Sequence, residues 1–275
     1  MSYYDIIVLE FGVDKIKYGF GHSLAPYGCY CSDSLGSLYV NRTDDKSVQR
    51  ERIQQVLKEV IIDSFGVVPK DKDVVILFPD VITRWFLNTI TEVLHEDLNV
   101  RGVCFVPQHY LPILATGNTT GFIIDVGVNR VLIVSIAFGI INTFLEGYIS
   151  IPYDKSYTQD SPSNPYFHCI NDHNSIAVSL LDHLLDSPID LRAKLISTVV
   201  VSGEGQAVTP LLEQSIRQTC LNEPKYEKLR AVIDKLHVFK SGEDSVWRGY
   251  YVYLTSGIRR ITYPKGKEEN GKRGL

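Results

Sequence analysis

The apolar positions of this chain alternate between short continuous runs and longer stretches with helical spacing. Residues 6–11 and 122–126 form apolar runs of roughly four to eight residues closed by Gly and Asn or Asp, which predicts a buried strand entering a tight hairpin in each case. Residues 46–65 carry apolar side chains at helical spacing and are followed by Gly66, which predicts one amphipathic helix. The alternation of strands and helices indicates an α/β architecture.

Further elements are predicted along the rest of the chain. Asp80 is the expected N-cap of a helix, and Thr209 followed by Pro210 is the expected start of another. The helix at 46–65 is expected to bury one face that includes Val48. The remaining predictions are strands at 73–78, 103–106 and 198–201, and helices at 108–116 and 175–185.

The two predicted hairpins resemble each other. Glu10-Phe11-Gly12-Val13-Asp14-Lys15 in the first corresponds to Asp125-Val126-Gly127-Val128-Asn129-Arg130 in the second. The second strand of each hairpin ends in Phe-Gly, at Phe20 and at Phe138. The pattern predicts two similar halves, each opening with a hairpin that carries a carboxylate at its turn. Chance similarity of two hairpins is the alternative.

Composition narrows the class of protein. The 275 residues are 44% apolar with a formal net charge of −4, so the chain is long and apolar enough for a core and too apolar for intrinsic disorder. The mild acidity argues against a general nucleic-acid binder. The longest apolar run, 131–141, is shorter than the ~20 residues of a membrane-spanning helix, and no signal peptide is predicted at the N-terminus.

The cysteines predict a reducing compartment. There are five, an odd number, and none forms a Cys-x-x-Cys pair, so we expect free thiols in the cytosol or nucleus. Cys29 and Cys31 lie on a predicted strand and are interpreted as packing residues.

Seven short motifs follow one another in the order found in a known family. Together they make the chain similar to the actin and actin-related protein family. The motifs are Lys17-Tyr18-Gly19-Phe20-Gly21, Pro107-Gln108 with Ala115-Thr116-Gly117-Asn118-Thr119-Thr120-Gly121, Asp125-Val126-Gly127, Glu146-Gly147-Tyr148, Asp190-Leu191-Arg192 with Leu195, Val201-Ser202-Gly203 and Ser245-Val246-Trp247-Arg248-Gly249.

The resemblance implies an α/β fold of the actin-like type, which is a duplicated ribonuclease H-like fold. It implies a first lobe formed by 1–116 with 237–275 and a second formed by 117–236. The chain is short near 36–46 and at 153–174, where the family carries its outer lobes, so we expect two inner lobes with the outer lobes reduced or absent. Because both outer lobes lie on the pointed-end side of an actin protomer, a docking surface is expected on the opposite face alone.

In the family, nucleotide phosphates lie between the two hairpins, and several residues depart from that pattern here. Phe11 and Val13 replace polar residues, Asp14 directs a negative charge toward the phosphates, and Val128 and Leu132 replace a carboxylate and a hydrolytic histidine. We therefore expect no catalytic residue, no metal site and no cofactor, while weak binding of ATP or ADP remains open.

Some residues of the family's nucleotide site remain. Lys17 could bind phosphate, or it could pair with Glu10 or Asp125. The remnant nucleotide-binding candidates are Glu10, Gly12, Lys17, Gln108, Asp125, Gly127 and Gly203.

The resemblance implies a non-catalytic subunit that caps the pointed end of an actin-like minifilament, as in dynactin, the cofactor of dynein in microtubule-based movement. The expected partners are a filament-forming actin-related protein and other pointed-end dynactin subunits, with no nucleic acid and no membrane, and the expected location is the cytoplasm and cytoskeleton. The partner-binding candidates are Leu145, Glu146, Gly147, Tyr148, Asp190 and Arg192. Two alternatives stay open: an actin-like scaffold subunit of a chromatin remodelling complex, and a degenerate ATPase or phosphotransferase of the same superfamily.

Overall fold

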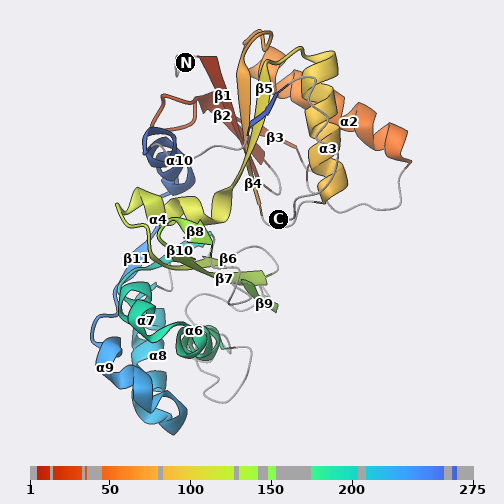
Figure 1. Cartoon of the computed structure of the whole chain (residues 1–275). Helices are drawn as coiled ribbons and strands as arrows, with labels where there is room; N and C mark the ends of the chain where they lie inside the picture. Colours follow the sequence, from red (N-terminus) through yellow and green to blue (C-terminus); the bar gives the residue numbers. More distant parts are fainter. Residues whose placement is uncertain are drawn as a thin grey trace. The chain divides into compact units, whose positions relative to one another are not determined.

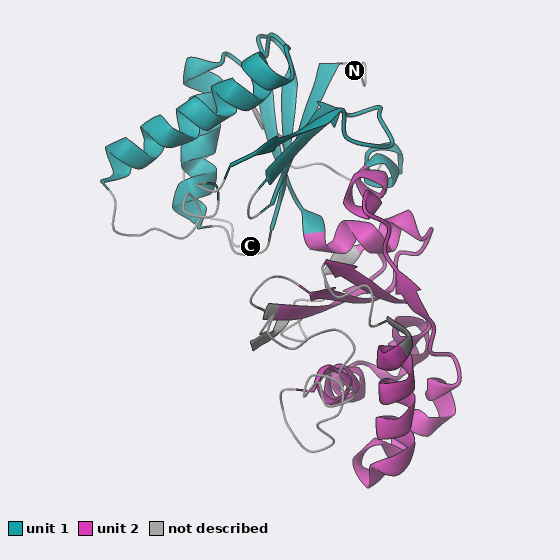
Figure 2. Ribbon diagram, turned by 180° about the vertical axis from the view of Figure 1, so that it is seen from behind, with its two compact units in different colours: residues 1–108, 251–275 teal, residues 109–250 magenta. Residues whose placement is uncertain are grey.

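The computed structural model divides the chain into two compact units. Unit 1 consists of residues 1–108 and 251–275, and unit 2 of residues 109–250 (Figure 2). The lobes expected from the sequence divide the chain after 116 and after 236 instead. The structure describes residues 5–12, 15–32, 35, 45–79, 83–126, 130–141, 148–152, 175–203, 209–256 and 262–264.

Unit 1 is built on a six-stranded mixed sheet with the order β12-β5-β4-β1-β2-β3 (Figure 1). Its strands are β1 (Ile6–Phe11), β2 (Lys15–Phe20), β3 (Gly28–Cys31), β4 (Asp73–Phe78), β5 (Gly102–Pro107) and β12 (Thr262–Pro264). The strands β1, β2 and β3 pair antiparallel in succession, whereas β4 lies parallel to β1 and β5 parallel to β4. The predicted first hairpin and the predicted strand at 73–78 are therefore confirmed.

Helices cover one face of this sheet. They are α2 (Lys46–Lys58) with its π-helical end η2 (Glu59–Ser64), and α3 (Arg84–Glu92) with its π-helical end η3 (Val93–Asp97). Their apolar side chains pack with alternate residues of β1, such as Ile7 and Leu9, in one buried cluster. Figure 1 shows α2 and α3 on one side of the sheet. The helix α10 (Ser245–Thr255) begins in unit 2 and ends in unit 1.

The helical predictions for unit 1 hold in outline and fail at two residues. The amphipathic stretch forms α2 and η2 and ends at Gly66, which adopts a positive φ of 69°. Val48, expected on the buried face, is 41% exposed. The next helix begins at Arg84, where the Thr83 hydroxyl accepts a hydrogen bond from the Phe86 amide at 3.2 Å, so Thr83 is the N-cap. Asp80, the predicted cap, lies outside the described residues.

Unit 2 contains a second mixed sheet with the order β11-β10-β6-β7-β8, and β9 also pairs with β7. Its strands are β6 (Gly121–Val126), β7 (Arg130–Ala137), β8 (Ile140–Ile141), β9 (Tyr148–Pro152), β10 (Val199–Gly203) and β11 (Val238–Lys240). Because β6 and β7 pair antiparallel, the second predicted hairpin is confirmed.

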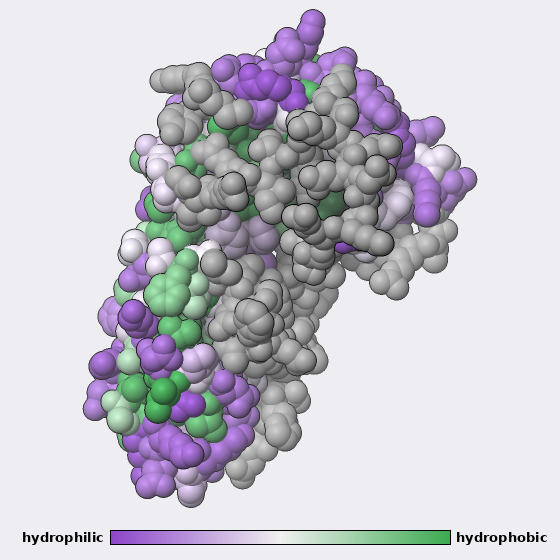
Figure 3. Space-filling view, in the orientation of Figure 1, coloured by the Kyte–Doolittle hydropathy of each residue, from purple (hydrophilic) through white to green (hydrophobic). Residues whose placement is uncertain are grey.

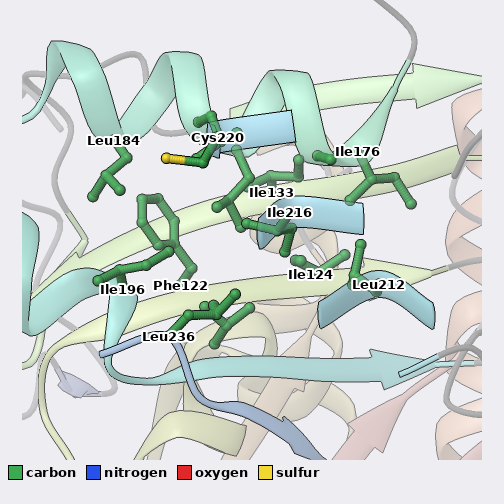
Figure 4. Packing of buried hydrophobic residues seen from close by; sticks show 14 of the residues in the cluster. Phe122, Ile124, Ile133, Ile176, Leu184, Ile196, Leu212, Ile216, Cys220 and Leu236 are labelled. Atoms are coloured by element: carbon green, nitrogen blue, oxygen red, sulfur yellow. The ribbon is translucent and has the colours of Figure 1, made fainter. Parts of the chain in front are cut away.

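One face of the second sheet is covered by helices that enclose a large apolar core. These helices are α6 (Ile176–Asp186), α7 (Ile189–Ile196), α8 (Thr209–Asn222), η7 (Pro224–Leu229) and α9 (Arg230–Ile233). Figure 4 shows side chains from the strands, such as Phe122 and Ile133, lying among those of the helices, such as Leu184 and Ile216. This burial is the main stabilising contribution to unit 2.

The short segment η4 (Gln108–Tyr110) leads from β5 into α4 (Leu111–Ala115), which contacts β6 and β10. Helix α10 passes very close to the start of α4. A Cβ atom at Gly249 would lie 1.9 Å from the Leu111 carbonyl oxygen, so only glycine permits this approach.

The two sheets share one order of strands. In each, the first two strands form the hairpin, the next strand after the helices lies parallel to the first, and a further parallel strand lies beyond it. The protein is thus α/β with two mixed sheets, which confirms the predicted class.

The described surface differs between the two units. Figure 3 shows mainly hydrophilic residues over α2, and hydrophobic areas among hydrophilic ones over the helices of unit 2. Exposed apolar side chains of unit 2 include Ile189, Leu211 and Leu221. None of the described helices combines the length and the apolar character that crossing a membrane requires.

Candidate functional site

Two of the predicted nucleotide-site residues form an ion pair across the first hairpin. Glu10 near the end of β1 lies opposite Lys17 in β2. The Lys17 Nζ atom is 3.9 Å from Glu10 Oε1, and both side chains are 13% exposed. In this largely buried position each charge offsets the desolvation of the other. Of the two pairings that the sequence left open for Lys17, the one with Glu10 is present in the structure.

Gly12 directly follows the first strand of the same hairpin. Its amide donates a hydrogen bond to the Lys15 carbonyl oxygen at 2.8 Å, which closes the hairpin. Val13 and Asp14, at the turn itself, lie outside the described residues. The Gly12 amide is therefore engaged by the backbone of unit 1.

Gln108 lies where β5 passes into η4. Its Oε1 atom is buried and has no hydrogen-bond partner among the residues that the structure describes. The predicted short helix at 108–116 is confirmed: it consists of η4 followed directly by α4, so its first turn is 3₁₀. Pro112 in the first turn of α4 fits the position where a missing amide is tolerated.

The acidic residue of the second hairpin, Asp125, is hydrogen-bonded by a strand outside the hairpin. Asp125 in β6 lies beside Ser202 of the parallel strand β10, whose hydroxyl donates a hydrogen bond to Asp125 Oδ1 at 2.8 Å. Across the hairpin, Asp125 faces Leu132, which is buried. The two equivalent carboxylates are therefore oriented differently: Glu10 by a lysine within its hairpin, and Asp125 by a hydroxyl from the neighbouring parallel strand.

Gly203 follows directly and requires glycine for two reasons. Its φ is +79°, and a Cβ atom there would lie 2.2 Å from the Val126 carbonyl oxygen. Glycine at this position allows the end of β10 to approach β6 and the Asp125 carboxylate. Gly127, the remaining nucleotide-site candidate, lies outside the described residues.

The predicted partner-binding residues occupy different environments. Leu145, Glu146 and Gly147 lie outside the described residues. Tyr148, expected beside a loop glycine, is the first residue of β9 and pairs with Val134 in the sheet.

The two candidates on α7 also differ from each other. Asp190 is exposed in the first turn of the helix. The Arg192 guanidinium donates hydrogen bonds to the carbonyl oxygens of Ser187 at 3.0 Å and Leu185 at 2.6 Å, at the end of α6. Arg192 therefore stabilises the connection between α6 and α7.

The turn after β7 presents an aromatic residue that sequence reasoning did not select as a site. Phe138 is 63% exposed and has a positive φ of 55°, a strained conformation for a residue other than glycine. The turn is held by hydrogen bonds from the Phe138 amide to Thr120 Oγ1 and from the Gly139 amide to the Thr119 carbonyl oxygen. Lys194 of α7 lies over the Phe138 ring, 5.2 Å from its centroid. The available sequence signal was the Phe-Gly ending of the strand.

The interpretation of Cys29 and Cys31 as packing residues is wrong. Both thiols are exposed on β3, and their Sγ atoms lie 3.5 Å apart. Partial desolvation raises the pKa of Cys29 and the hydrogen bond with Cys31 raises it further, while the charges of Lys15 and Lys17 act in the opposite direction. The alternation of a strand, read without knowing which face is covered, could not show that these thiols point to solvent.

Within the described ranges, no group of three or more His, Cys, Asp or Glu side chains is arranged to hold a metal ion. Neither a protein-family model nor a curated protein matches this sequence.

Proposed function

We propose that this chain is a non-catalytic actin-related protein that caps the pointed end of an actin-like minifilament, as a subunit of dynactin. The observation that carries the proposal is the strand order common to the two units. Each sheet opens with a hairpin whose first strand ends in acid-x-Gly, and each places the next strand parallel to the first. An actin-like duplicated fold requires such an internal repeat. The repeat therefore supports the proposal in addition to the sequence motifs that resemble the family.

The lengths of two connections support the capping role. Only residues 32–45 join β3 to α2, and only residues 153–175 join β9 to α6. A segment shorter than about 40 residues rarely builds a core of its own. At the positions where the family carries outer lobes, the chain is therefore too short for lobes of comparable size. A subunit without these lobes offers the next protomer little surface on its pointed-end side.

The state of the remnant nucleotide residues supports a role without catalysis. Lys17 is engaged by Glu10, and Asp125 by Ser202. Leu132 places an apolar side chain opposite Asp125, where the family has its hydrolytic histidine. In these interactions the charged groups of Lys17 and Asp125 bind other side chains of the protein, as expected of structural and not catalytic residues.

An exposed group of residues on unit 2 supports docking to a protein partner. Phe138 and Ile189 are 63% and 80% exposed, and Lys194 and Asp190 are exposed on the same short helix, α7, as Ile189. An aromatic side chain held rigidly in solvent is a typical anchor of a protein interface.

The test is co-purification of the tagged chain with the filament-forming actin-related protein from its own cells. The double variant Phe138→Ser with Asp190→Lys is expected to reduce the recovered filament protein about tenfold, which corresponds to about 1.4 kcal/mol. The matched control is Glu227→Lys, which reverses an exposed acid in the first turn of η7. Unchanged recovery with the double variant, or a wild-type preparation without any actin-related protein, would refute the proposal.

A further inference from the structure

One of the two edge strands of the first sheet, β3, carries two thiols side by side. Among the described strands β3 pairs with β2 alone, and Cys29 and Cys31 occupy alternate positions on it. Tyr30 between them points to the other face, where its hydroxyl donates a hydrogen bond to Glu59 of η2. Both cysteines therefore lie on the face away from α2 and η2, exposed and with their Sγ atoms 3.5 Å apart.

Two lysines lie beside the thiols. In the register of β2 and β3, Lys15 is opposite Cys31 and Lys17 is opposite Cys29, and residues directly opposite in a sheet share one face. Both lysines therefore lie on the same face as the sulfur atoms, and Lys17 lies there in its ion pair with Glu10. The thiolate, not the thiol, is the form that binds a metal ion.

The spacing of a strand disfavours a disulfide between these cysteines. With a rise of about 3.3 Å per residue, alternate Cα atoms are about 6.6 Å apart, close to the upper limit of about 6.8 Å for a disulfide. The Cβ atoms of such side chains lie nearly as far apart, whereas a disulfide needs about 4 Å. Closing the bond would require the strand to bend. An ion between the sulfur atoms would require only rotation of the side chains.

The number of thiolates available at this site indicates which metal ion it could bind. Thiolates prefer soft ions, chiefly Cu(I), zinc and iron–sulfur clusters. Structural zinc and iron–sulfur clusters take four ligands. In the part of the chain that the structure describes, no third His, Cys, Asp or Glu joins this pair to form such a group. Two thiolates alone suffice for a monovalent copper ion.

We propose that Cys29 and Cys31 form a dithiolate site that chelates one Cu(I) ion. On binding, the two thiols release two protons, and the complex of one monovalent cation with two thiolates carries one net negative charge. Lys15, which lies opposite Cys31, offsets that charge. The site is independent of the docking function proposed above, so either can fail without the other.

The experiment titrates the reduced full chain with Cu(I) under anaerobic conditions against a chromophoric Cu(I) chelator. We expect one equivalent to bind per chain and to protect two thiols from an aromatic disulfide reagent. Cys29→Ser and Cys31→Ser are each expected to weaken binding about 10²-fold or more, because the second ligand is lost. Lys15→Gln is expected to weaken binding severalfold. Cys169→Ser is the control and should bind like the wild type.

The serine variants are isosteric changes at exposed positions, and a circular dichroism spectrum will verify their fold. Equal Cu(I) affinity in the wild type and both serine variants would overturn the proposal. So would conversion of the pair by oxidised glutathione to an intramolecular disulfide without any competitive Cu(I) binding. Binding of half an equivalent of zinc with formation of a dimer would overturn it as well, because the four thiolates of two chains would then form the site.

Discussion

Ser135 Oγ and His183 Nε2 are hydrogen-bonded at 2.9 Å in the interior of unit 2, linking β7 to α6. His183 is buried, and its ring lies edge-on to Phe122 with the ring centroids 5.3 Å apart. Its Nδ1 atom has no hydrogen-bond partner among the described residues. Burial lowers the pKa of His183, and the charge of Asp186 opposes this effect to a lesser degree. The imidazole is therefore neutral in the folded protein at neutral pH.

This arrangement predicts a loss of stability in mild acid. An unfolded histidine titrates near pH 6.5, whereas folded His183 takes up a proton only at lower pH, so below about pH 6.5 the unfolded state binds more protons. The contribution of His183 to the free energy of unfolding is therefore fully present above about pH 6.5. It is expected to decrease progressively as the pH falls below about 6.5. Urea unfolding at about pH 7.5 and about pH 5 measures the change. His183→Gln should reduce the difference between the two pH values, and an unaltered difference would contradict the assignment.

Gly203→Ala is expected to destabilise unit 2 by about 2 kcal/mol or more, because the new Cβ would meet the backbone of β6 in a left-handed conformation. Thermal unfolding followed by circular dichroism tests this. Gly66→Ala is the matched control: that residue also has a positive φ but nothing lies within 4 Å of a new Cβ, so its cost should be only about 1 kcal/mol. Equal costs at the two positions would show that the approach to Val126 is unimportant.

A double-mutant cycle on Glu10 and Lys17 tests whether their pairing is structural. Glu10→Gln and Lys17→Met should each destabilise the protein, and the double variant should cost less than the sum. We expect a coupling free energy of about 1 kcal/mol, because both side chains are largely buried. Additive costs would mean that the 3.9 Å contact contributes nothing.

Mg-ATP is expected to leave the melting temperature of the chain unchanged. A ligand at concentration c that binds only the folded state stabilises it by RT ln(1 + c/Kd), so even weak specific binding would appear as a shift once the Mg-ATP concentration exceeds the Kd. The absence of a shift is expected because Lys17 is engaged by Glu10 and Asp14 adds a negative charge to the same hairpin. A clear upward shift that Lys17→Met removes would indicate a working phosphate site.

Arg192→Ala is expected to destabilise unit 2 by about 1–3 kcal/mol, since two charge-assisted hydrogen bonds to the end of α6 are lost. Asp190→Lys should cost less than about 1 kcal/mol, because this exposed acid contributes only its interaction with the N-terminus of α7. Chemical denaturation compares the two variants. If Arg192→Ala is as stable as the wild type, the assignment of Arg192 to the connection between α6 and α7 is wrong.

The accuracy of the sequence predictions followed the strength of the local signal. The stretch at 46–65 formed a helix as predicted because its apolar spacing and Gly66 specify the same structure. The prediction that Val48 is buried was wrong, because helical spacing indicates which residues share a face but not how far the covering sheet extends along that face. Similarly, an acidic residue before a helical pattern is a possible cap, but the chain begins α3 at Thr83, which the same preference for capping side chains also allows.

The sequence by itself determined the α/β class, both hairpins and their two carboxylates, because strand and helix periodicity and turn residues act over a few neighbouring positions. Only the tertiary structure decided what the carboxylates bind, that Arg192 holds two helices together, and that Cys29 and Cys31 face solvent. These properties depend on which strands become neighbours and which sheet face the helices cover. Such relationships join residues far apart in the chain, and no local pattern of side chains encodes them.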